Sequence, residues 1–163
     1  PFGHCSAQFH MRAPIFVARQ LGKHQGGLVW NEVSRRYVSD DPEMWYTEEW
    51  RKVADDKKQG SSEELVMSPK IMSNIYKNAI DHATEAYKSL LSQGVCEEQA
   101  RAVLPQGMYT EWYWSGSIAA FARVCKLRLA SDTQKETRDV VKNINRQLEQ
   151  RFPVSWKALQ GAM

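Results

Sequence analysis

The sequence predicts a helix-rich α+β fold with a small, mostly antiparallel sheet. Two segments, 5–13 and 108–114, alternate apolar and polar residues, which is typical of half-buried strands. Longer segments repeat apolar residues at helical spacing, most clearly between residues 69 and 93. Because a sheet of two strands is marginal in water, we expect further strands, from N-terminal residues or from neighbouring subunits, to complete it.

The composition is that of one ordinary globular domain. A length of 163 residues, with 42% hydrophobic and 25% charged residues, excludes a fully disordered chain. No apolar run approaches the roughly 18 residues of a membrane span, so we expect no membrane contact. Three cysteines are too few for a disulfide framework. They favour a cytoplasmic location, in a bacterium or, for a viral protein, in its host. Because the chain starts at Pro1, we expect the single domain 1–163 to lack its N-terminal part.

The first half of the chain predicts one strand, one helix and a long irregular region. In the strand Cys5–Ala13, every second side chain is apolar or small and faces the core. Pro14 suits the first turn of a helix, where no backbone N–H is needed, and a Gly-Gly pair ends that helix. Residues 28–37 show no clean period, so we expect a structured loop with short extended pieces. The polar segment 39–67 predicts a variable, flexible insertion with a short helix around 45–54.

The second half predicts four helices and one strand. Ser68 and Pro69 supply an N-cap and a proline at the first helical position. The spacing of Ser131 and Gln134 is that of a capping box for the last helix, which we expect to stop at Pro153. The expected elements are, in order, a helix at 69–93, a short helix at 97–104, a strand at 108–114, a helix at 118–129 and a helix at 131–152.

The densest polar cluster follows the first helix. It begins at Lys23, crosses the two glycines and ends with Asn31–Tyr37. The glycines let the backbone approach a ligand closely, and Lys23, Arg35 and Arg36 suit an anion such as phosphate. A solvated loop with local side-chain caps is the alternative interpretation of the same residues.

The cysteines and the aromatic residues allow fewer functional inferences. No two cysteines are close in sequence and no zinc-like spacing exists, so we expect no metal site. We interpret all three cysteines as small core residues. The aromatic run Tyr109–Trp114 is either a stacking platform for a base or a pterin, or a part of the core and of a subunit interface.

A longer pattern of residues runs through the chain. Eight residues separate Lys23-His24-Gln25 from Ser34, with Asn31-Glu32 before this serine and Arg36-Tyr37 after it. Further along follow Ala100-Arg101-Ala102-Val103-Leu104-Pro105, Tyr109-Thr110, Trp114, Leu127-Arg128 and Gln134. Together these residues resemble the flavin-dependent thymidylate synthases, whose signature is Arg-His-Arg, seven or eight residues, then Ser.

The resemblance implies an enzyme, a methyltransferase that makes thymidylate (dTMP) from deoxyuridylate (dUMP). The family uses FAD, with NAD(P)H and 5,10-methylenetetrahydrofolate as co-substrates. The reduced flavin delivers hydride to the pyrimidine ring, and no cysteine attacks that ring. Members of the family are homotetramers whose active sites draw on more than one subunit, which would suit an incomplete sheet.

The resemblance also implies roles for individual residues. Arg36 and Arg101 would bind the nucleotide's phosphate by charge-assisted hydrogen bonds. Arg128 would be catalytic, meeting the pyrimidine edge and stabilising the charge that develops there. The nucleotide-binding residues implied are Gln20, Glu32, Ser34, Arg36, Arg101 and Arg128. The implied FAD-binding residues are Lys23, His24, Gln25, Asn31 and Leu127, the last lining the flavin ring.

Two alternatives stay open. The chain departs from the family pattern where Lys23 and Gln25 stand in place of the two arginines of Arg-His-Arg. The first alternative is a flavin-dependent hydroxylase or hydroxymethylase of a pyrimidine deoxynucleotide, because these departures fall at positions that handle flavin or folate. The second is a non-catalytic module that binds nucleotides or RNA. A net charge of +3, from 22 basic and 19 acidic residues dispersed along the chain, disfavours this module, so we expect no nucleic-acid partner.

Overall fold

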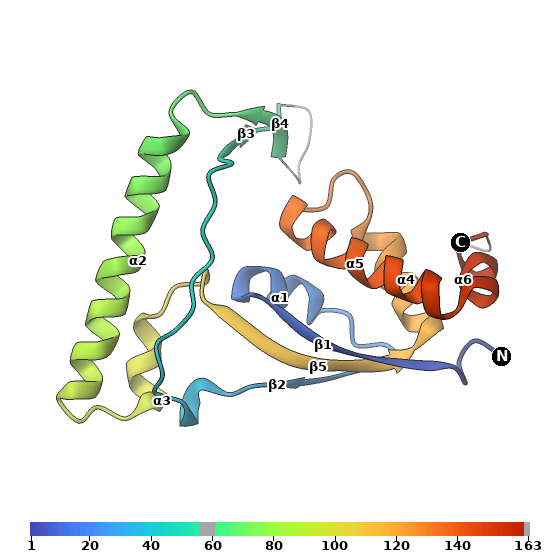
Figure 1. Cartoon of the computed structure of the whole chain (residues 1–163), viewed down its shortest axis with the longest axis horizontal. Helices are drawn as coiled ribbons and strands as arrows, with labels where there is room; N and C mark the ends of the chain where they lie inside the picture. The colour runs from blue at the N-terminus through green and yellow to red at the C-terminus, as the bar shows by residue number, and fades with distance from the viewer. Residues whose placement is uncertain (56–60, 162–163) are drawn as a thin grey trace.

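The computed structural model describes residues 1–55 and 61–161, and it confirms the α+β fold (Figure 1). A three-stranded sheet has the order β1-β5-β2. The outer strands β1 (Ser6–Pro14) and β2 (Leu28–Glu32) both run antiparallel to the central β5 (Tyr109–Ser117). Separately, β3 (Arg51–Val53) pairs with β4 (Ser61–Leu65), and we call this pair the β3–β4 ribbon.

The helices form two groups around the sheet (Figure 1). Helices α1, α4, α5 and α6 pack with the sheet around one core, whereas the long α2 stands apart beside α3. The bounds are α1 (Ile15–Leu21), α2 (Pro69–Ser92), α3 (Glu97–Ala100), α4 (Ile118–Arg128), α5 (Lys135–Arg151) and α6 (Pro153–Gly161), with 3-10 helices η1 (Arg35–Tyr37) and η2 (Arg101–Val103).

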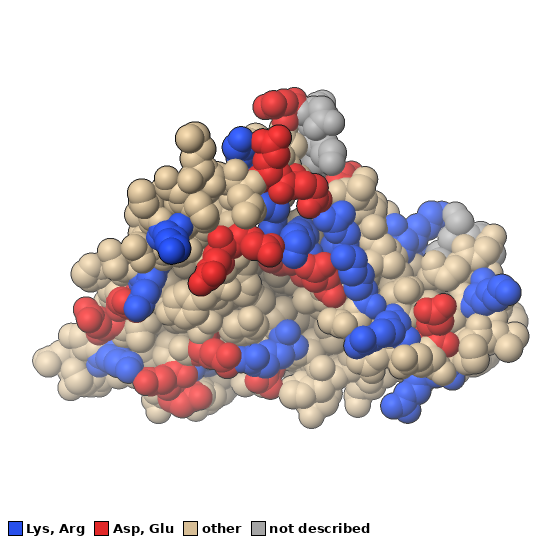
Figure 2. Space-filling view, turned by 45° about the horizontal axis from the view of Figure 1, so that its top comes forward, with Lys and Arg blue, Asp and Glu red and all other residues tan. Residues whose placement is uncertain are grey.

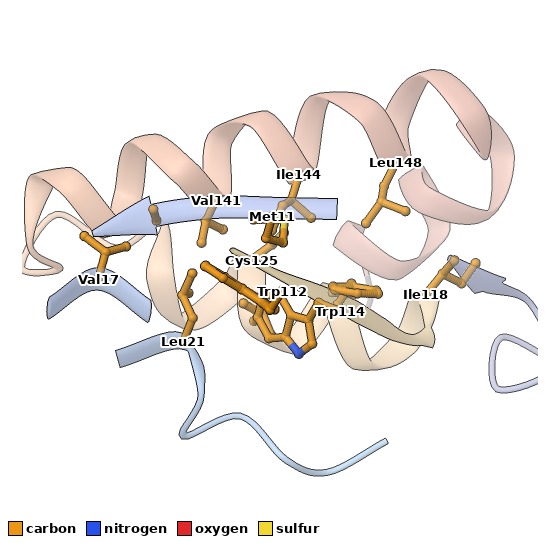
Figure 3. Close-up of a cluster of buried hydrophobic side chains, with 14 of the residues drawn as sticks. Met11, Val17, Leu21, Trp112, Trp114, Ile118, Cys125, Val141, Ile144 and Leu148 are labelled. Atoms are coloured by element: carbon orange, nitrogen blue, oxygen red, sulfur yellow. The ribbon is translucent and has the colours of Figure 1, made fainter. Parts of the chain in front are cut away.

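The main core lies between the sheet and helices α1, α4, α5 and α6 (Figure 3). Trp112 and Trp114 of β5 are fully buried, and Trp30 of β2 stacks on Trp112 with ring centroids 4.3 Å apart. Tyr113, on the opposite face of β5, is half exposed. The buried tryptophans of the aromatic run therefore belong to the core, and this burial fixes the orientation of the whole strand.

The third strand of the sheet comes from this chain, in a segment where we expected a loop. Leu28 and Trp30 pack against the core, but the intervening Val29 is 68% exposed. An apolar residue on the open face hides the period of two that would have predicted a strand. Completion of the sheet by N-terminal residues or neighbouring subunits stays a prediction.

The insertion 39–67 contains the β3–β4 ribbon. The helix that we expected around 45–54 is wrong, because β3 is extended and pairs with β4. The cause is tertiary: Arg51 of β3 reaches Glu136 of α5, a partner that no local pattern indicates. Residues 56–60 lie outside the described residues, and the expected variability and flexibility of 39–67 stay predictions.

The end of the chain differs from expectation in two places. Helix α5 begins at Lys135 with Gln134 as its N-cap, so the predicted capping box at Ser131 is wrong. The carbonyl of Ser131 accepts a hydrogen bond from Arg138 instead, at 3.2 Å. Pro153 ends α5 as expected, but it also begins α6, since proline suits a first helical turn.

The three cysteines occupy different environments. Cys125 is buried, and burial raises the pKa of its thiol to about 12, so it is un-ionised at neutral pH. Cys5 packs against the core, whereas Cys96 is exposed, so our interpretation of all three as core residues is wrong for Cys96.

None of the described helices is both long enough and apolar enough to cross a membrane.

Gly116 sets how closely β2 can approach β5. A Cβ at this position would meet the carbonyl oxygen of Gly27 and would lie 3.2 Å from the Cα of Leu28. We expect G116A to lower the free energy of unfolding by about 1–3 kcal/mol, measured by urea denaturation, because β2 must move away. The control is G3A, since a Cβ on Gly3 has nothing within 4 Å. An equal loss in the two variants would contradict the packing argument.

Candidate active site

A cleft of about 660 Å³ opens where η1, β5 and η2 meet, and we call it the η1 cleft. Glu32, Ser34, Arg36 and Arg101 all line it, and these are four of the six predicted nucleotide residues. Arg101 is far from the other three in sequence. Helix α3 packs against η1 and so brings Arg101 to them.

Two adjacent arginines of η1 have different environments. Arg35 turns toward Asp40, donating to its backbone carbonyl at 2.8 Å and to its carboxylate at 3.2 Å, and its side chain is only 14% exposed. Arg36 is exposed and donates from Nε to the Oγ of Ser34 at 3.0 Å. Ser34 also N-caps η1. Arg35 therefore holds the turn, while Arg36 is directed by Ser34 and is open to a ligand.

The remaining polar groups of the η1 cleft are held by neighbours. Glu32 accepts a hydrogen bond from Thr110 at 2.7 Å and another from the indole of Trp30 at 3.1 Å. Arg101 donates from Nε to the carbonyl of Glu98 at 3.3 Å. These bonds restrict the side chains before any ligand arrives, which lowers the entropy lost on binding.

The charges around the site are mixed in sign. Arg12, at the rim of the η1 cleft, pairs with Glu43 and lies 3.6 Å from Glu111. Figure 2 shows Asp and Glu side chains beside Lys and Arg side chains on the visible face. This distribution suits a small anionic ligand better than a nucleic-acid backbone.

A second group of predicted residues meets where α1 and α4 end. Arg128 donates from Nε to His24 Nε2 at 2.9 Å and from Nη2 to the backbone carbonyl of Gln20 at 3.4 Å. Gln20, Leu127 and Arg128 line a cleft of about 770 Å³ beside the start of α5, which we call the α5 cleft.

His24 is a hydrogen-bond acceptor in this group. Partial burial, followed by the positive charge of Arg128, lowers the pKa of His24 below its ordinary value of 6.5. Because Nε2 accepts from the guanidinium of Arg128, we assign the neutral ring a proton on Nδ1.

The predicted FAD residues fall into separate places. Lys23, His24 and Gln25 line a third cleft of about 370 Å³, the α1 cleft, which shares Glu32 with the η1 cleft. Leu127 lies in the α5 cleft, while Asn31 lies in β2 opposite Tyr113 and lines none of these three clefts. The three consecutive FAD residues Lys23, His24 and Gln25 thus share the α1 cleft, while Leu127 and Asn31 lie outside it.

The α5 cleft contains residues that the sequence analysis missed. Arg51 and Ser61 reach it from the β3–β4 ribbon, and Thr133 and Gln134 from the turn that precedes α5. Gln134 belongs to the family pattern and to the predicted capping box, but neither assigns it to the site. Arg51 lies in a segment with no sequence pattern to single it out. Among the described residues, no group of three His, Cys, Asp or Glu side chains is placed to hold a metal ion.

Comparison with known proteins finds extensive similarity. A family model described as "Thymidylate synthase complementing protein" matches residues 1–154. The flavin-dependent thymidylate synthase of Thermus thermophilus is 37% identical over 160 residues, which are 98% of this chain and 58% of that protein. The protein of the same name from Thermosipho africanus is 33% identical over 159 residues, 97% of this chain and 69% of that protein. The chain thus spans about 58% of the length of its Thermus relative.

A solved structure is also similar. The crystal structure of a UMP/dUMP methylase, PolB from Streptomyces cacaoi, bound with 5-Br dUMP, aligns with a TM-score of 0.81 and 27% identity. The alignment covers 99% of this chain and 73% of that one.

The depressed pKa of His24 predicts acid sensitivity. The fold favours the neutral His24 ring over the protonated one. The contribution of the neutral ring to the free energy of unfolding is therefore complete above pH 6.5 and is lost as the pH falls below 6.5. Besides Arg128, the charged groups Arg19, Lys23 and Glu32 line the same cleft. NMR titration of the His24 ring, assigned with H24N, should give a pKa below 6.5, and R128M should raise it. A pKa at or above 6.5 in the unchanged protein would contradict the neutral assignment.

Proposed function

Because the chain belongs to the thymidylate synthase complementing protein family, we propose that it acts as a flavin-dependent thymidylate synthase. The reaction is the reductive methylation of dUMP to dTMP. Methylenetetrahydrofolate provides the one-carbon unit, and NAD(P)H reduces the flavin.

One observation carries this proposal. Glu32, Ser34, Arg36 and Arg101, which the resemblance implies for the nucleotide, line a single cleft. Arg101 is far from the other three in sequence, and the packing of α3 against η1 brings it to them. Their meeting in the η1 cleft supports a nucleotide monophosphate as the ligand of this chain.

The phosphate would bind between Arg36 and Arg101. Both side chains are exposed, and two guanidinium groups can donate several charge-assisted hydrogen bonds to phosphate oxygens. Ser34 orients Arg36 and adds a hydroxyl donor, while Arg35 stays occupied by Asp40.

The pyrimidine would lie toward Gln20 and Arg128. The amide of Gln20 is held by Gln134 and Thr137, and its backbone carbonyl holds Arg128. A guanidinium fixed in this way can stabilise negative charge on a pyrimidine oxygen as the ring is attacked, with little reorganisation.

The residues of the α1 and α5 clefts fit a flavin in their chemistry. Lys23 offers a cation for a diphosphate. Gly27, in the left-handed region at φ 76°, lets the backbone turn between Gln25 and β2. Leu127 is 59% exposed and offers an apolar surface for a ring. When bound, FAD would supply the hydride for the reduction.

The predicted residues other than Asn31 are divided among three open clefts, which supports assembly of complete sites from several copies. We propose a homotetramer with shared active sites, located in the cytoplasm.

Binding of dUMP tests the phosphate site. We expect R101A to raise the Kd for dUMP by about 10- to 100-fold, because a charge-assisted bond to the phosphate is lost. The same variant should leave deoxyuridine binding nearly unchanged, since deoxyuridine has no phosphate. The matched control is R146A, an exposed arginine of α5 that bonds to Asn143 at 3.4 Å. Isothermal titration calorimetry measures both ligands, and equal losses for dUMP and deoxyuridine would argue against phosphate recognition.

The mass of the product identifies the reaction. With FAD, NADPH, methylenetetrahydrofolate and dUMP, we expect a nucleotide heavier by one methylene group, seen by mass spectrometry. A gain of oxygen, or of a hydroxymethyl group, would replace this proposal with the hydroxylase or hydroxymethylase. Tight, salt-dependent binding of oligonucleotides without flavin or product would favour the non-catalytic module.

A further inference from the structure

We propose that Arg51 and Glu136 form a positioning pair, which joins the β3–β4 ribbon to Arg128 and holds that arginine in its working orientation. This inference rests on the proposed function of Arg128. It assigns a role to a segment, 39–67, that the resemblance to the family leaves without one.

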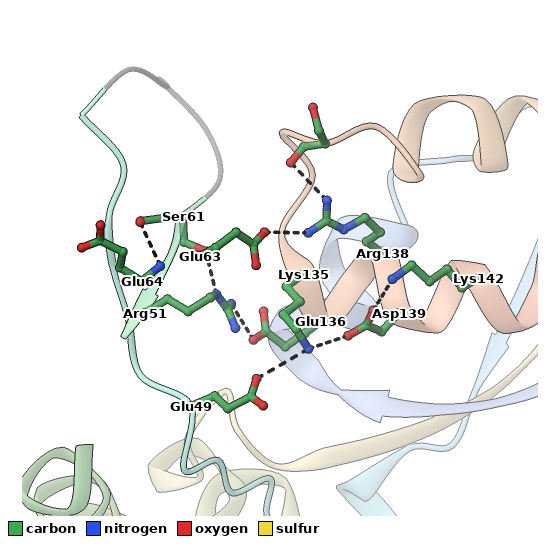
Figure 4. A network of polar contacts seen from close by, with 12 residues as sticks. Glu49, Arg51, Ser61, Glu63, Glu64, Lys135, Glu136, Arg138, Asp139 and Lys142 are labelled. Atoms are coloured by element: carbon green, nitrogen blue, oxygen red, sulfur yellow. Dashed lines mark hydrogen bonds and ion pairs between the residues drawn. The ribbon is translucent and has the colours of Figure 1, made fainter. Parts of the chain in front are cut away.

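The pair is the most sheltered contact between the ribbon and α5 (Figure 4). Arg51 donates from Nη2 to the Oε1 of Glu136 at 2.7 Å and from Nε to the Oγ of Ser61 at 2.6 Å. The side chains of Arg51 and Glu136 are only 14% and 17% exposed. Breaking such a pair leaves a charge with little water to solvate it, which costs far more than breaking a surface pair.

The neighbouring ion pairs are longer and more exposed. Glu63 of the ribbon lies 3.9 Å from Arg138, and Glu49 lies 3.7 Å from Lys135, with both glutamates more than half exposed (Figure 4). Water and salt screen contacts of this kind. The orientation of the ribbon on α5 therefore depends mainly on Arg51 and Glu136.

Glu136 lies in the first turn of α5, next to Thr137 and two residues after Gln134, so its pairing with Arg51 fixes this turn. Burial would raise the pKa of Glu136, but hydrogen bonding from Arg51 and from its own backbone holds that pKa below its ordinary value. The other carboxylate oxygen, Oε2, is buried without a partner of good geometry among the described residues. An ionised, sheltered carboxylate fixes the donor beside it, here Arg51, and with it the ribbon against the first turn of α5.

The contacts continue from Gln134 to the predicted catalytic residue. Gln20 donates from its side-chain amide to the Oε1 of Gln134, and its own Oε1 accepts from Thr137 at 3.1 Å. The backbone carbonyl of Gln20 then accepts from Arg128. Arg51 also lines the α5 cleft together with Arg128. The ribbon is thus bonded to the first turn of α5 through Glu136, and Gln134 and Thr137 beside Glu136 are bonded through Gln20 to Arg128, which in turn bonds to His24.

Steady-state kinetics of the full chain with FAD and co-substrates test the pair. We expect R51Q and E136Q each to lower kcat by about 10-fold or more while the KM for dUMP changes less than about 3-fold, because transition-state stabilisation by Arg128 is lost. The charge-swapped double variant R51E/E136R should recover part of kcat. The matched control is K52M, which removes an exposed ion pair between Lys52 and Glu64 within the same ribbon. It should stay within about 2-fold of the unchanged protein.

The NMR titration of His24 separates positioning from a merely structural role. If Arg128 loses its orientation, the His24 pKa should rise in E136Q but not in K52M. Unchanged kcat and an unchanged His24 pKa in both R51Q and E136Q, with only a lower Tm, would overturn the inference. If the unchanged protein makes no dTMP, the proposed function fails, and the His24 titration still decides whether the pair positions Arg128.

Discussion

The antiparallel pairing of β5 with both of its neighbours is the constraint on which the site depends. Trp112 and Trp114 anchor β5 in the core, and Trp30 anchors β2 against it. Each strand then leads directly into a segment of the site: β1 into α1, β2 into η1, and β5 into α4. Because the strands share one rigid sheet, Gln20, Arg36 and Arg128 are delivered from one scaffold although they are distant in sequence.

Local electrostatics divides the arginines into two kinds. Arg35 and Arg51 are largely buried against carboxylates and hold backbone segments in place. Arg36 and Arg101 are exposed, with only light constraint from a serine hydroxyl and a backbone carbonyl, so their charge remains available to an anion. The same residue type serves structure or recognition according to whether a carboxylate lies within reach, which composition cannot reveal.

The clearest periodic patterns predicted the fold best. The helix at 69–93 and the strand at 108–114 appear as α2 and β5, because each combines a clear period with clear end signals. The pattern failed for β2, where Val29 is apolar on the open face, and for β3, whose partner Glu136 lies 85 positions away. The exposure of Val29 and the contact with Glu136 are both set by the tertiary structure, so neither can be predicted from the local sequence.

The sequence by itself determined the α+β class, the periodic helices and strands, and the similarity by which the family is identified. It also singled out Ser34, Arg36 and Arg101, because their order and spacing are a property of the chain. Only the tertiary structure decided which of these residues meet, that Arg35 turns away while Arg36 stays open, and that the β3–β4 ribbon reaches the surroundings of Arg128. The physical reason is that burial, hydrogen-bond partners and charge neutralisation arise between segments far apart in sequence, and they exist only once the core has brought those segments together.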